Sequence, residues 1–167
     1  SLGRPIRWFW HGPSPQTGEP PRLMQEVTYD ARSGKVARRS VPVSEGTAES
    51  KLLFDEYKYD AVGREVLHTT PWKATVQTTY DGLLVHVTDQ LKNVTTTEHD
   101  PLGRPVRITD AAKGLTSYVH GPFGFLYSVT DPGTLADPSG AVTVTLRDAL
   151  GRVKQLDDPD RGTTIQV

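Results

Sequence analysis

The stretch Tyr59-Asp60-Ala61-Val62-Gly63-Arg64 decides the fold of this chain, because it recurs along the sequence. Each copy ends an alternating, extended-type segment and closes a short turn with Gly-Arg. Two further copies are His99-Asp100-Pro101-Leu102-Gly103-Arg104 and Arg147-Asp148-Ala149-Leu150-Gly151-Arg152. Self-similarity at a short period indicates a repeat architecture and not a pocket enzyme. The box predicts an array of β-hairpins.

The residue types of the box fit a tight turn. An aspartate at the first position accepts hydrogen bonds from backbone N–H groups further along the turn, and glycine at the fourth position allows a positive φ. Pro101 stands at the second position, where its fixed φ suits a type I turn. We expect the box to set turns and not to form a site. The expected turn residues are Asp30, Gly34, Tyr59, Asp60, Gly63, Arg64, Tyr80, Asp81, Asp100, Gly103, Arg104, Asp148, Gly151 and Arg152.

Alignment on the aspartate gives the register of the repeat. The anchors are Asp30, Asp60, Asp81, Asp100 and Asp148, and Gly121 fills a degenerate anchor. The basic unit is about 20 residues long, with inserts before Asp60 and Asp148. A second set of turn signals, such as residues 110–114 and 158–162, falls between the anchors. Alternating turns of this kind predict an all-β, curved antiparallel meander of roughly a dozen strands or slightly more.

Composition supports this fold class and excludes several others. Hydrophobic residues make up 35% of the 167 residues, which is low for a thick core, and no segment has helical periodicity. The net charge of -1 does not favour nucleic acid or an anionic membrane as a partner. Cysteine is absent, which excludes disulfides and thiolate zinc sites. There is no apolar run of about 20 residues and no recognisable signal peptide in residues 1–20.

The ends of the chain also follow the repeat. Ser1-Leu2-Gly3-Arg4-Pro5 matches Pro101-Leu102-Gly103-Arg104-Pro105, and residues 162–167 begin another strand. We therefore expect residues 1–167 to be a single array of about seven units, cut at both ends from a longer chain. Open sheet edges at both ends would otherwise be a liability.

The aligned boxes resemble the YD-repeat, or RHS-repeat, family. Tyr57-Lys58-Tyr59-Asp60-Ala61-Val62-Gly63-Arg64 matches the second half of that family's unit, and Gly140-Ala141-Val142-Thr143 matches the first half. Asp148-Ala149-Leu150-Gly151-Arg152 with residues 157–162 is typical of long RHS proteins. The sequence departs from the pattern at Lys73 and Lys92, which replace an upstream glycine, at Gly121, and after Asp81, where Gly-Arg is missing.

The resemblance implies a structural role. In bacterial toxin complexes and polymorphic toxins, such repeats form a β-sheet that spirals into a hollow shell around a toxin domain, and teneurins carry similar repeats outside cells. It implies a non-enzymatic wall segment that helps to encapsulate and deliver a toxin, secreted or extracellular. Its partners would be the rest of the shell, the toxin domain and other toxin-complex subunits. The family's self-cleaving aspartyl site has no counterpart here, so we expect no catalytic residue, cofactor or metal.

A rival function is a carbohydrate- or receptor-binding module outside cells. Trp8, Trp10 and Trp72 could stack on a sugar or a cation. Packing against neighbouring hairpins is the favoured interpretation, because aromatic residues usually serve packing. Residues 12–22 and 44–51 are expected to be loops that interrupt the array, and loops are where partners commonly bind.

Histidines and acidic clusters give weaker signals. His11, His68, His86, His99 and His120 have no i, i+4 ligand spacing, so strand positions are favoured over a metal site or a pH switch. The acidic residues between 157 and 160 lack the pattern of a calcium loop and indicate a turn. The nucleophile elbow Gly-x-Ser-x-Gly and a phosphate-binding glycine loop are also missing.

Overall fold

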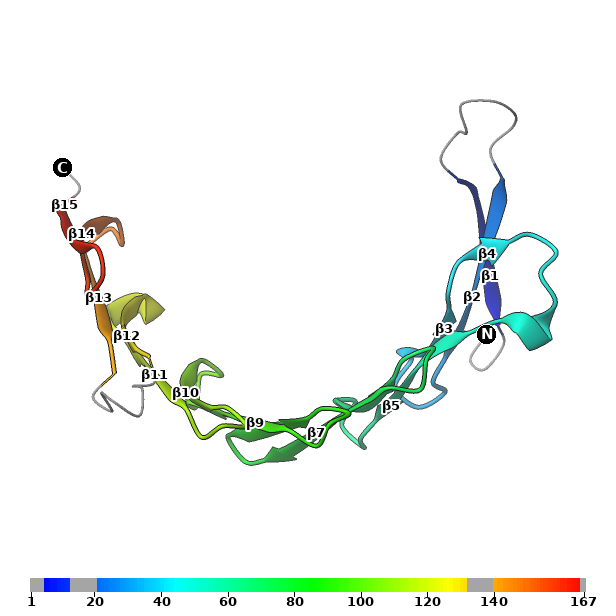
Figure 1. Ribbon diagram of the computed structural model, residues 1–167, viewed down its shortest axis with the longest axis horizontal. Helices are drawn as coiled ribbons and strands as arrows, with labels where there is room; N and C mark the ends of the chain where they lie inside the picture. The colour runs from blue at the N-terminus through cyan, green and yellow to red at the C-terminus, as the bar shows by residue number, and fades with distance from the viewer. Residues whose placement is uncertain (1–4, 13–20, 132–139, 166–167) are drawn as a thin grey trace. The chain divides into compact units, whose positions relative to one another are not determined.

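The protein folds almost entirely into β-strands. The computed structural model describes residues 5–12, 21–131 and 140–165. These residues contain fifteen strands, two 3₁₀ turns and no α-helix (Figure 1). The strands are β1 (Ile6–His11), β2 (Arg22–Tyr29), β3 (Val36–Ser40), β4 (Val43–Ser44), β5 (Phe54–Tyr59), β6 (Glu65–Thr69), β7 (Thr75–Asp81), β8 (Leu84–Thr88), β9 (Val94–His99), β10 (Pro105–Thr109), β11 (Leu115–His120), β12 (Leu126–Thr130), β13 (Val142–Arg147), β14 (Val153–Asp158) and β15 (Gly162–Ile165). The 3₁₀ turns are η1 (Glu49–Lys51) and η2 (Pro122–Gly124).

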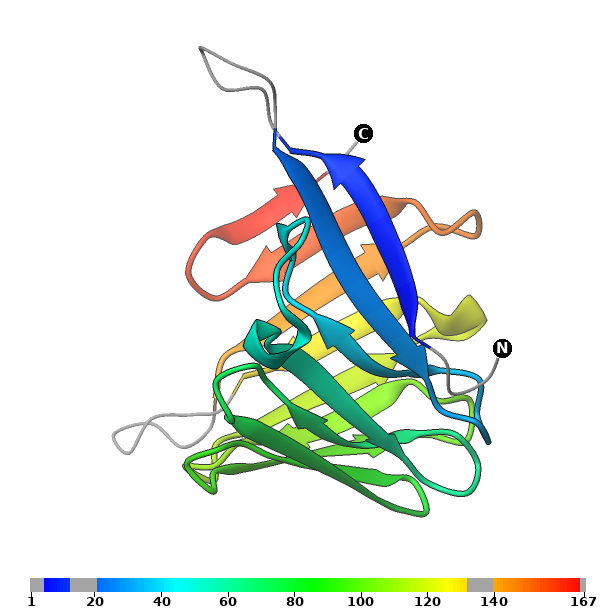
Figure 2. The same ribbon diagram turned by 90° about the vertical axis from the view of Figure 1, so that its right-hand side faces the viewer.

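The strands form one open sheet in the order of the sequence. Each strand from β1 to β15 lies beside its neighbours along the chain, except that β4 pairs with β2 and β3 therefore pairs with β5. The pairs are antiparallel, as in the β1–β2 hairpin of Figure 2. The predicted all-β class and antiparallel meander are confirmed. The repeat match at residues 1–4 and residues 13–20 of the loop expected at 12–22 lie outside the described residues.

Two hairpins have a shift in strand register next to the turn of the repeat box. The register of β5 on β6 shifts between Lys58 and Tyr59, next to the Asp60 turn. The register of β13 on β14 shifts between Leu146 and Arg147, next to the Asp148 turn. Such a shift accompanies a three-residue hairpin loop that ends in a residue with positive φ, which forms a bulge.

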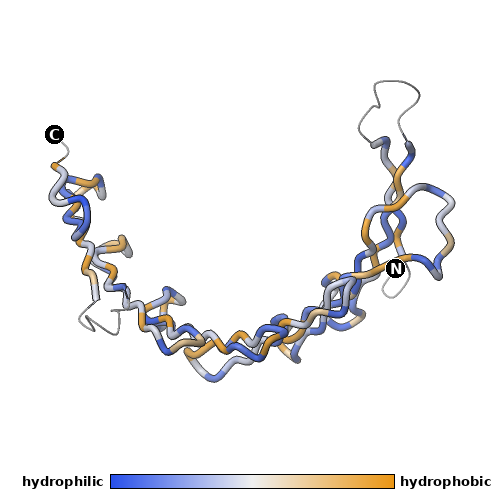
Figure 3. Tube along the Cα trace, viewed as in Figure 1, coloured by the Kyte–Doolittle hydropathy of each residue, from blue (hydrophilic) through white to orange (hydrophobic). Residues whose placement is uncertain are grey.

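The chain divides into two compact units. The first contains residues 1–78 and 88–91, and the second contains residues 79–87 and 92–167. In the first unit, the buried hydrophobic side chains are Met24, Val27 and Leu52. In the second unit, the described residues are all half-buried or exposed. Hydrophobic and hydrophilic residues alternate along the trace without a long hydrophobic segment (Figure 3).

The first unit also contains a charged cluster. Glu26 of β2 is buried, and its carboxylate accepts hydrogen bonds from Arg7 of β1 (3.1 Å) and Arg38 of β3 (3.2 Å). Arg7 also pairs with Glu49, which lies in the segment between β4 and β5. The Glu26 N–H donates to the hydroxyl of the buried Ser40 at 2.8 Å. The segment that contains Glu49, predicted as a loop at residues 44–51, is therefore joined to β1 by the ion pair of Glu49 with Arg7.

Candidate functional site: the repeat turns

The Asp100 turn shows how the repeat box works. The Asp100 carboxylate accepts hydrogen bonds from the backbone N–H groups of Leu102 (2.9 Å) and Arg104 (3.0 Å). The Arg104 Nε donates to the other carboxylate oxygen at 2.7 Å. Gly103 has a φ of +78° and donates its N–H to the Asp100 carbonyl at 2.9 Å. The carboxylate is thus occupied by donors of its own turn, which makes it a structural acceptor.

The turns at Asp60 and Asp148 repeat this geometry. In each, the carboxylate accepts from the N–H groups two and four residues later, at 2.9–3.0 Å. The guanidinium Nε of Arg64 or Arg152 binds the second oxygen at 2.8 or 2.7 Å. In all three copies of the box, the aspartate therefore accepts the same set of hydrogen bonds from its own turn, as expected.

These hydrogen bonds lower the pKa of the anchor carboxyls. The Arg104 guanidinium and then its N–H lower the pKa of Asp100. The Arg152 N–H and then its side chain do the same for the pKa of Asp148. Partial burial raises the pKa of Asp60, but the combined hydrogen bonds from Arg64 and Val62 outweigh it, so its pKa is also lowered. Hydrogen bonds to the ionised form favour that form.

The first anchor has a longer turn. Asp30 accepts from the Ser33 N–H (2.7 Å) and hydroxyl (2.8 Å), and these bonds lower its pKa. Gly34, one position later than in the other boxes, has a φ of +68° and donates its N–H to the Asp30 carbonyl. Lys35 then donates to the Gly63 carbonyl at 2.7 Å, which links this turn to the next.

The expected turn at Asp81 is different. Asp81 is the last residue of β7, and β8 begins at Leu84, so residues 82 and 83 form a two-residue connection. The positive φ of +57° falls on Gly82 and not three residues after the aspartate. Asp81 is therefore not a box anchor, and the reason is that Gly82 lets the chain reverse earlier. Tyr80 lies within β7.

The turn at Gly121 lacks the carboxylate and adopts another conformation. Gly121 and Phe125 still close the turn, with the Gly121 N–H donating to the Phe125 carbonyl at 2.8 Å. Phe123 has φ 61° and ψ 14°, which is the conformation of the third residue of a type II turn. In the aspartate boxes, the carboxylate accepts a hydrogen bond from the N–H of the third residue. Gly121 has no carboxylate, and this explains why the turn at the degenerate anchor has another conformation.

Lysines replace glycine in the turns at the other ends of the strands. Lys73, Lys92 and Lys113 have φ values of 66°, 68° and 71°. The N–H of Lys73 donates to the Thr70 carbonyl at 2.9 Å, and the N–H of Lys113 donates to the Asp110 carbonyl at 3.1 Å. The turn is thus closed at Lys73, where the sequence departs from the family pattern, and in the same way at Lys113, each at the cost of a left-handed lysine.

The aromatic position before the anchor joins neighbouring repeats. The Tyr59 hydroxyl donates to the Val36 carbonyl at 2.7 Å. In the second unit, His120 occupies the same position of its box, and its Nε2 lies 2.7 Å from the Pro105 carbonyl. Because a carbonyl only accepts, Nε2 carries the proton, and the buried Nδ1 has no partner. His99, at the third such position, has its Nδ1 3.4 Å from the Leu83 carbonyl.

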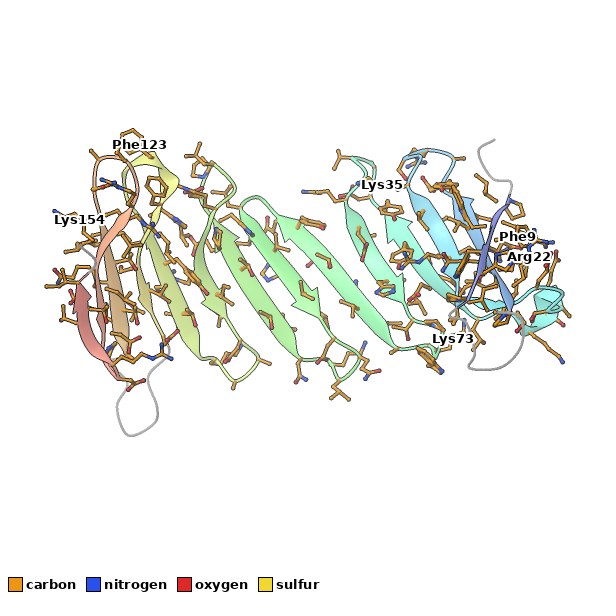
Figure 4. The ribbon with its side chains drawn as sticks, turned by 90° about the horizontal axis from the view of Figure 1, so that it is seen from above. Phe9, Arg22, Lys35, Lys73, Phe123 and Lys154 are labelled. Carbon is orange, nitrogen blue, oxygen red and sulfur yellow. The ribbon has the colours of Figure 1, made fainter. Side chains whose placement is uncertain are left out.

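The tryptophans proposed for ligand stacking are exposed. Trp8 and Trp10 lie on one face of the edge strand β1, while Phe9 on the other face lies under the Arg22 guanidinium at 5.0 Å (Figure 4). Trp72 is 78% exposed and lines an open pocket of about 280 Å³ together with Arg39 and Asp55. The favoured interpretation of Trp72 as a packed residue is wrong, because most of its side chain is exposed.

Sequence reasoning missed a polar cluster beside this pocket. The His68 Nε2 lies 2.8 Å from the Asp55 carboxylate, and the His68 ring stacks on Tyr57 with 4.7 Å between centroids. Arg39 donates to the Tyr57 hydroxyl at 3.4 Å. Tyr57 and His68 lie directly opposite each other in the β5–β6 pair. Pairing the sequences on either side of the Asp60 turn would therefore have placed the two side chains next to each other.

The described residues hold no cluster of three or more histidine or acidic side chains suited to a metal ion. Asp158 accepts from the N–H groups of Asp160 and Arg161, as expected for a turn. Asp157 binds Thr163 and Gln155, which lower its pKa. In the same part of the chain, no helix is long and apolar enough to cross a bilayer.

Comparison with known proteins identifies the repeat. Residues 79–115 match the family model described as RHS Repeat, and the resemblance to the RHS-repeat family is confirmed on this segment. The match runs from the end of β7 to the start of β11 and includes the Asp100 turn. A comparison with curated proteins gives no sequence match.

Solved structures of TcdB2-TccC3 share the fold. A crystal structure of TcdB2-TccC3 without its hypervariable C-terminal region matches with a TM-score of 0.64 and 12% identity over 84% of this chain. Structures of TcdB2-TccC3-Cdc42 and TcdB2-TccC3-TEV match with TM-scores of 0.61 and 0.59, at 12% and 18% identity, over 85% and 84% of this chain. The chain spans 8–10% of the length of these proteins. At such identities the likeness shows the fold.

Proposed function

We propose that this chain is a non-enzymatic wall segment of an RHS-repeat shell that encloses a toxin domain and takes part in its delivery outside the producing cell. The observation that carries this proposal is the single open sheet in which the described residues of the second unit are all at least partly exposed. A globular enzyme buries a core between two or more layers. A sheet with both faces accessible is suited to separating two compartments.

The chemistry of the repeat turns supports the same function. The carboxylates of Asp60, Asp100 and Asp148 are occupied within their own turns, so they are not free to act as bases or ligands. The match to RHS repeats and the fold shared with TcdB2-TccC3 add support. In the proposed shell, the partners of this segment are neighbouring repeats and the enclosed domain.

The proposal is tested on the full-length polypeptide that contains these repeats. We expect limited proteolysis to spare a C-terminal domain while the repeats are folded, and to degrade the same domain when it is expressed alone. Equal cleavage in both contexts would overturn the encapsulating function. A full-length sequence with a membrane span and extracellular partner domains would instead favour recognition.

A second candidate is a binding module for carbohydrates or a receptor. The exposed indole of Trp72 lines a pocket with Arg39 and Asp55, and a flat ring beside polar groups suits a sugar. We would measure the thermal shift of the chain with a panel of soluble oligosaccharides. A reproducible stabilisation that is lost in Trp72→Ala or Trp8→Ala would favour this candidate, and the shell function predicts no shift.

A further inference from the structure

The pocket beside Trp72 collects polar side chains from one face of the first unit. Arg39 of β3 and Asp55 of β5 lie directly opposite each other, and cross-strand partners point to the same face of a sheet. Tyr57 lies two residues after Asp55 and opposite His68 of β6, so all four side chains share that face. Trp72 follows in the turn between β6 and β7 and lines the pocket with Arg39 and Asp55. Two opposite charges and an exposed indole therefore lie around one pocket.

The two charged groups of the pocket are directed to other partners and not to each other. The Asp55 carboxylate lies 2.8 Å from the His68 Nε2, through Oδ1, and forms no ion pair with Arg39 in the described part of the chain. The Arg39 guanidinium donates instead to the Tyr57 hydroxyl at 3.4 Å. The Tyr57 and His68 rings stack with 4.7 Å between their centroids. Each ring of this stack thus holds one of the two charged side chains.

A pair of the same kind in the second unit is closed. Arg107 of β10 lies directly opposite Glu98 of β9, and its guanidinium is 3.3 Å from the Glu98 carboxylate. An arginine and a carboxylate in directly opposite positions can therefore form an ion pair in this sheet. The open arrangement of Arg39 and Asp55 is a local feature, which follows from the contacts of these two residues with Tyr57 and His68.

The neighbouring lysine does not neutralise Asp55. Lys73 comes directly after Trp72, but its ammonium group lies 3.4 Å from the Glu56 carboxylate. Glu56 is next to Asp55 in β5, so its side chain lies on the opposite face of the sheet. Among the described residues that line the pocket, Arg39 is the one cation and Asp55 is the one carboxylate.

The other walls of the pocket suit a small ligand with a flat apolar group. Val41, Pro42, Pro71 and Trp72 supply apolar surface, and the volume is about 280 Å³. Sites for drug-sized ligands have volumes of roughly 300–1,000 Å³, so this pocket fits a smaller molecule. Trp72 is 78% exposed, and its indole is therefore accessible for stacking against an aromatic ring.

We propose that this pocket binds a free α-amino acid with an aromatic side chain. The carboxylate of the ligand pairs with the Arg39 guanidinium, and its ammonium group pairs with the Asp55 carboxylate. The ligand's ring lies on the Trp72 indole. The side chains of cross-strand partners start about 4.5–5.5 Å apart, which suits two charges that are separated by one carbon atom.

Charge complementarity selects this ligand over other classes. An anion would meet the carboxylate of Asp55, and a cation would meet the guanidinium of Arg39. A neutral sugar would leave both charged groups without an ionic partner, and a residue inside a polypeptide has neither a free α-ammonium nor a free α-carboxylate. A free amino acid has both. This binding function goes beyond the proposed wall segment and does not depend on it.

An NMR titration with L-phenylalanine tests the proposal on the unaltered chain. The chain has three tryptophans, and Trp72→Phe identifies the indole N–H signal of Trp72 by its loss. We expect that signal to shift saturably, with a Kd on the order of 1 mM because an open pocket of this size offers few contacts. Phenylalanine methyl ester and N-acetylphenylalanine each lack one of the two charges and should bind about tenfold more weakly. Equal affinity for the ester and the free amino acid, or no saturable shift with phenylalanine, would overturn the proposal.

Variants of the two charged residues provide the second test. Arg39→Gln and Asp55→Asn should each weaken the binding of phenylalanine about tenfold. Arg107→Gln is the matched control, since it removes the arginine of the closed pair in the second unit and should leave the affinity unchanged. Unchanged affinity in both pocket variants, or a neutral oligosaccharide that binds at the Trp72 signal more tightly than phenylalanine, would refute the amino-acid site. The comparison of phenylalanine with its ester needs no variant, so it decides the question even if a substitution unfolds the chain.

Discussion

The two units of the molecule carry the same kind of hairpins but differ in burial. In the first unit, the segment between β3 and β5 is tied to β1, and Met24, Leu52 and Glu26 are buried. In the second unit, the strands pair in the same way, yet the described residues include none that is buried. The repeat by itself thus makes a sheet, and a local core appears only where a longer connection accompanies it.

This difference assigns the stability of the units to different sources. Burial of apolar surface contributes to the first unit, at about 25 cal/mol per Å². The second unit depends on its backbone ladder and on the turns that fix its register. We therefore expect core changes to act on the first unit and turn changes to act most strongly on the second, and hydrogen exchange resolves the two.

The largest effect should come from the charged cluster of the first unit. Glu26→Ala leaves Arg7 and Arg38 without their shared acceptor, and because both guanidinium groups are partly exposed, we expect a loss of about 2–3 kcal/mol. Chemical denaturation measures the loss, and hydrogen exchange should place it in β1–β3. Glu98→Ala is the control, since its 3.3 Å pair with Arg107 is exposed and should contribute less than about 1 kcal/mol. Equal losses of unfolding free energy in the two variants would show that the buried carboxylate contributes no more than the exposed one.

The next largest effect should arise at a glycine of the second unit. Gly151→Ala places a methyl group against the Phe125 ring at a φ of +83°, so steric strain adds to the backbone cost, for a total of about 2 kcal/mol or more. Gly63→Ala has the same kind of φ (+85°) but no atom within 4 Å of the added Cβ, and should cost about 1 kcal/mol. Thermal unfolding of both variants gives the comparison. A cost at Gly63 equal to that at Gly151 would show that neighbouring turns do not pack as described.

Most of the fold followed from the repeat, for a physical reason. Asp100 and Gly103 specify their turn locally, through a carboxylate acceptor and a positive φ, so the sequence is sufficient to predict it. The same local chemistry made the meander predictable, because short antiparallel connections leave few other topologies.

The remaining features depended on contacts that a local pattern does not contain. The cluster at Glu26 joins β1, β2 and β3, and the stack of Tyr57 on His68 requires the register of β5 on β6. The prediction of a box turn at Asp81 was wrong for a local reason, because Gly82 has a positive φ and lets the chain reverse directly after the aspartate. Exposure of Trp72 was unpredictable from residue type, because tryptophan is usually buried in large part.

A smaller effect should appear in acid, and it concerns the turns of both units. The pKa values of Asp60, Asp100 and Asp148 are lowered in the folded state, so their contribution to stability is complete above the unfolded pKa of about 4. It is lost as the pH falls from there through the lowered folded values. A variant with all three changed to Asn should have a flatter dependence of unfolding free energy on pH below 4. An unchanged slope would show that the carboxylates do not hold the turns as ions.

The smallest effect should be a gain, at the turns where lysine stands in place of glycine. Lys113 has a φ of 71°, which is unfavourable for a residue with a Cβ, so Lys113→Gly relieves strain in the second unit. Glycine also loses more entropy on folding, and the net stabilisation should be about 0.5 kcal/mol. Lys154→Gly is the control: Lys154 lies within β14 and is not among the positive-φ residues of the described chain, so glycine there should destabilise. Thermal unfolding that shows a loss at Lys113 as large as at Lys154 would mean that the left-handed lysine carries no strain, and lysine would then be the more stable residue at this turn.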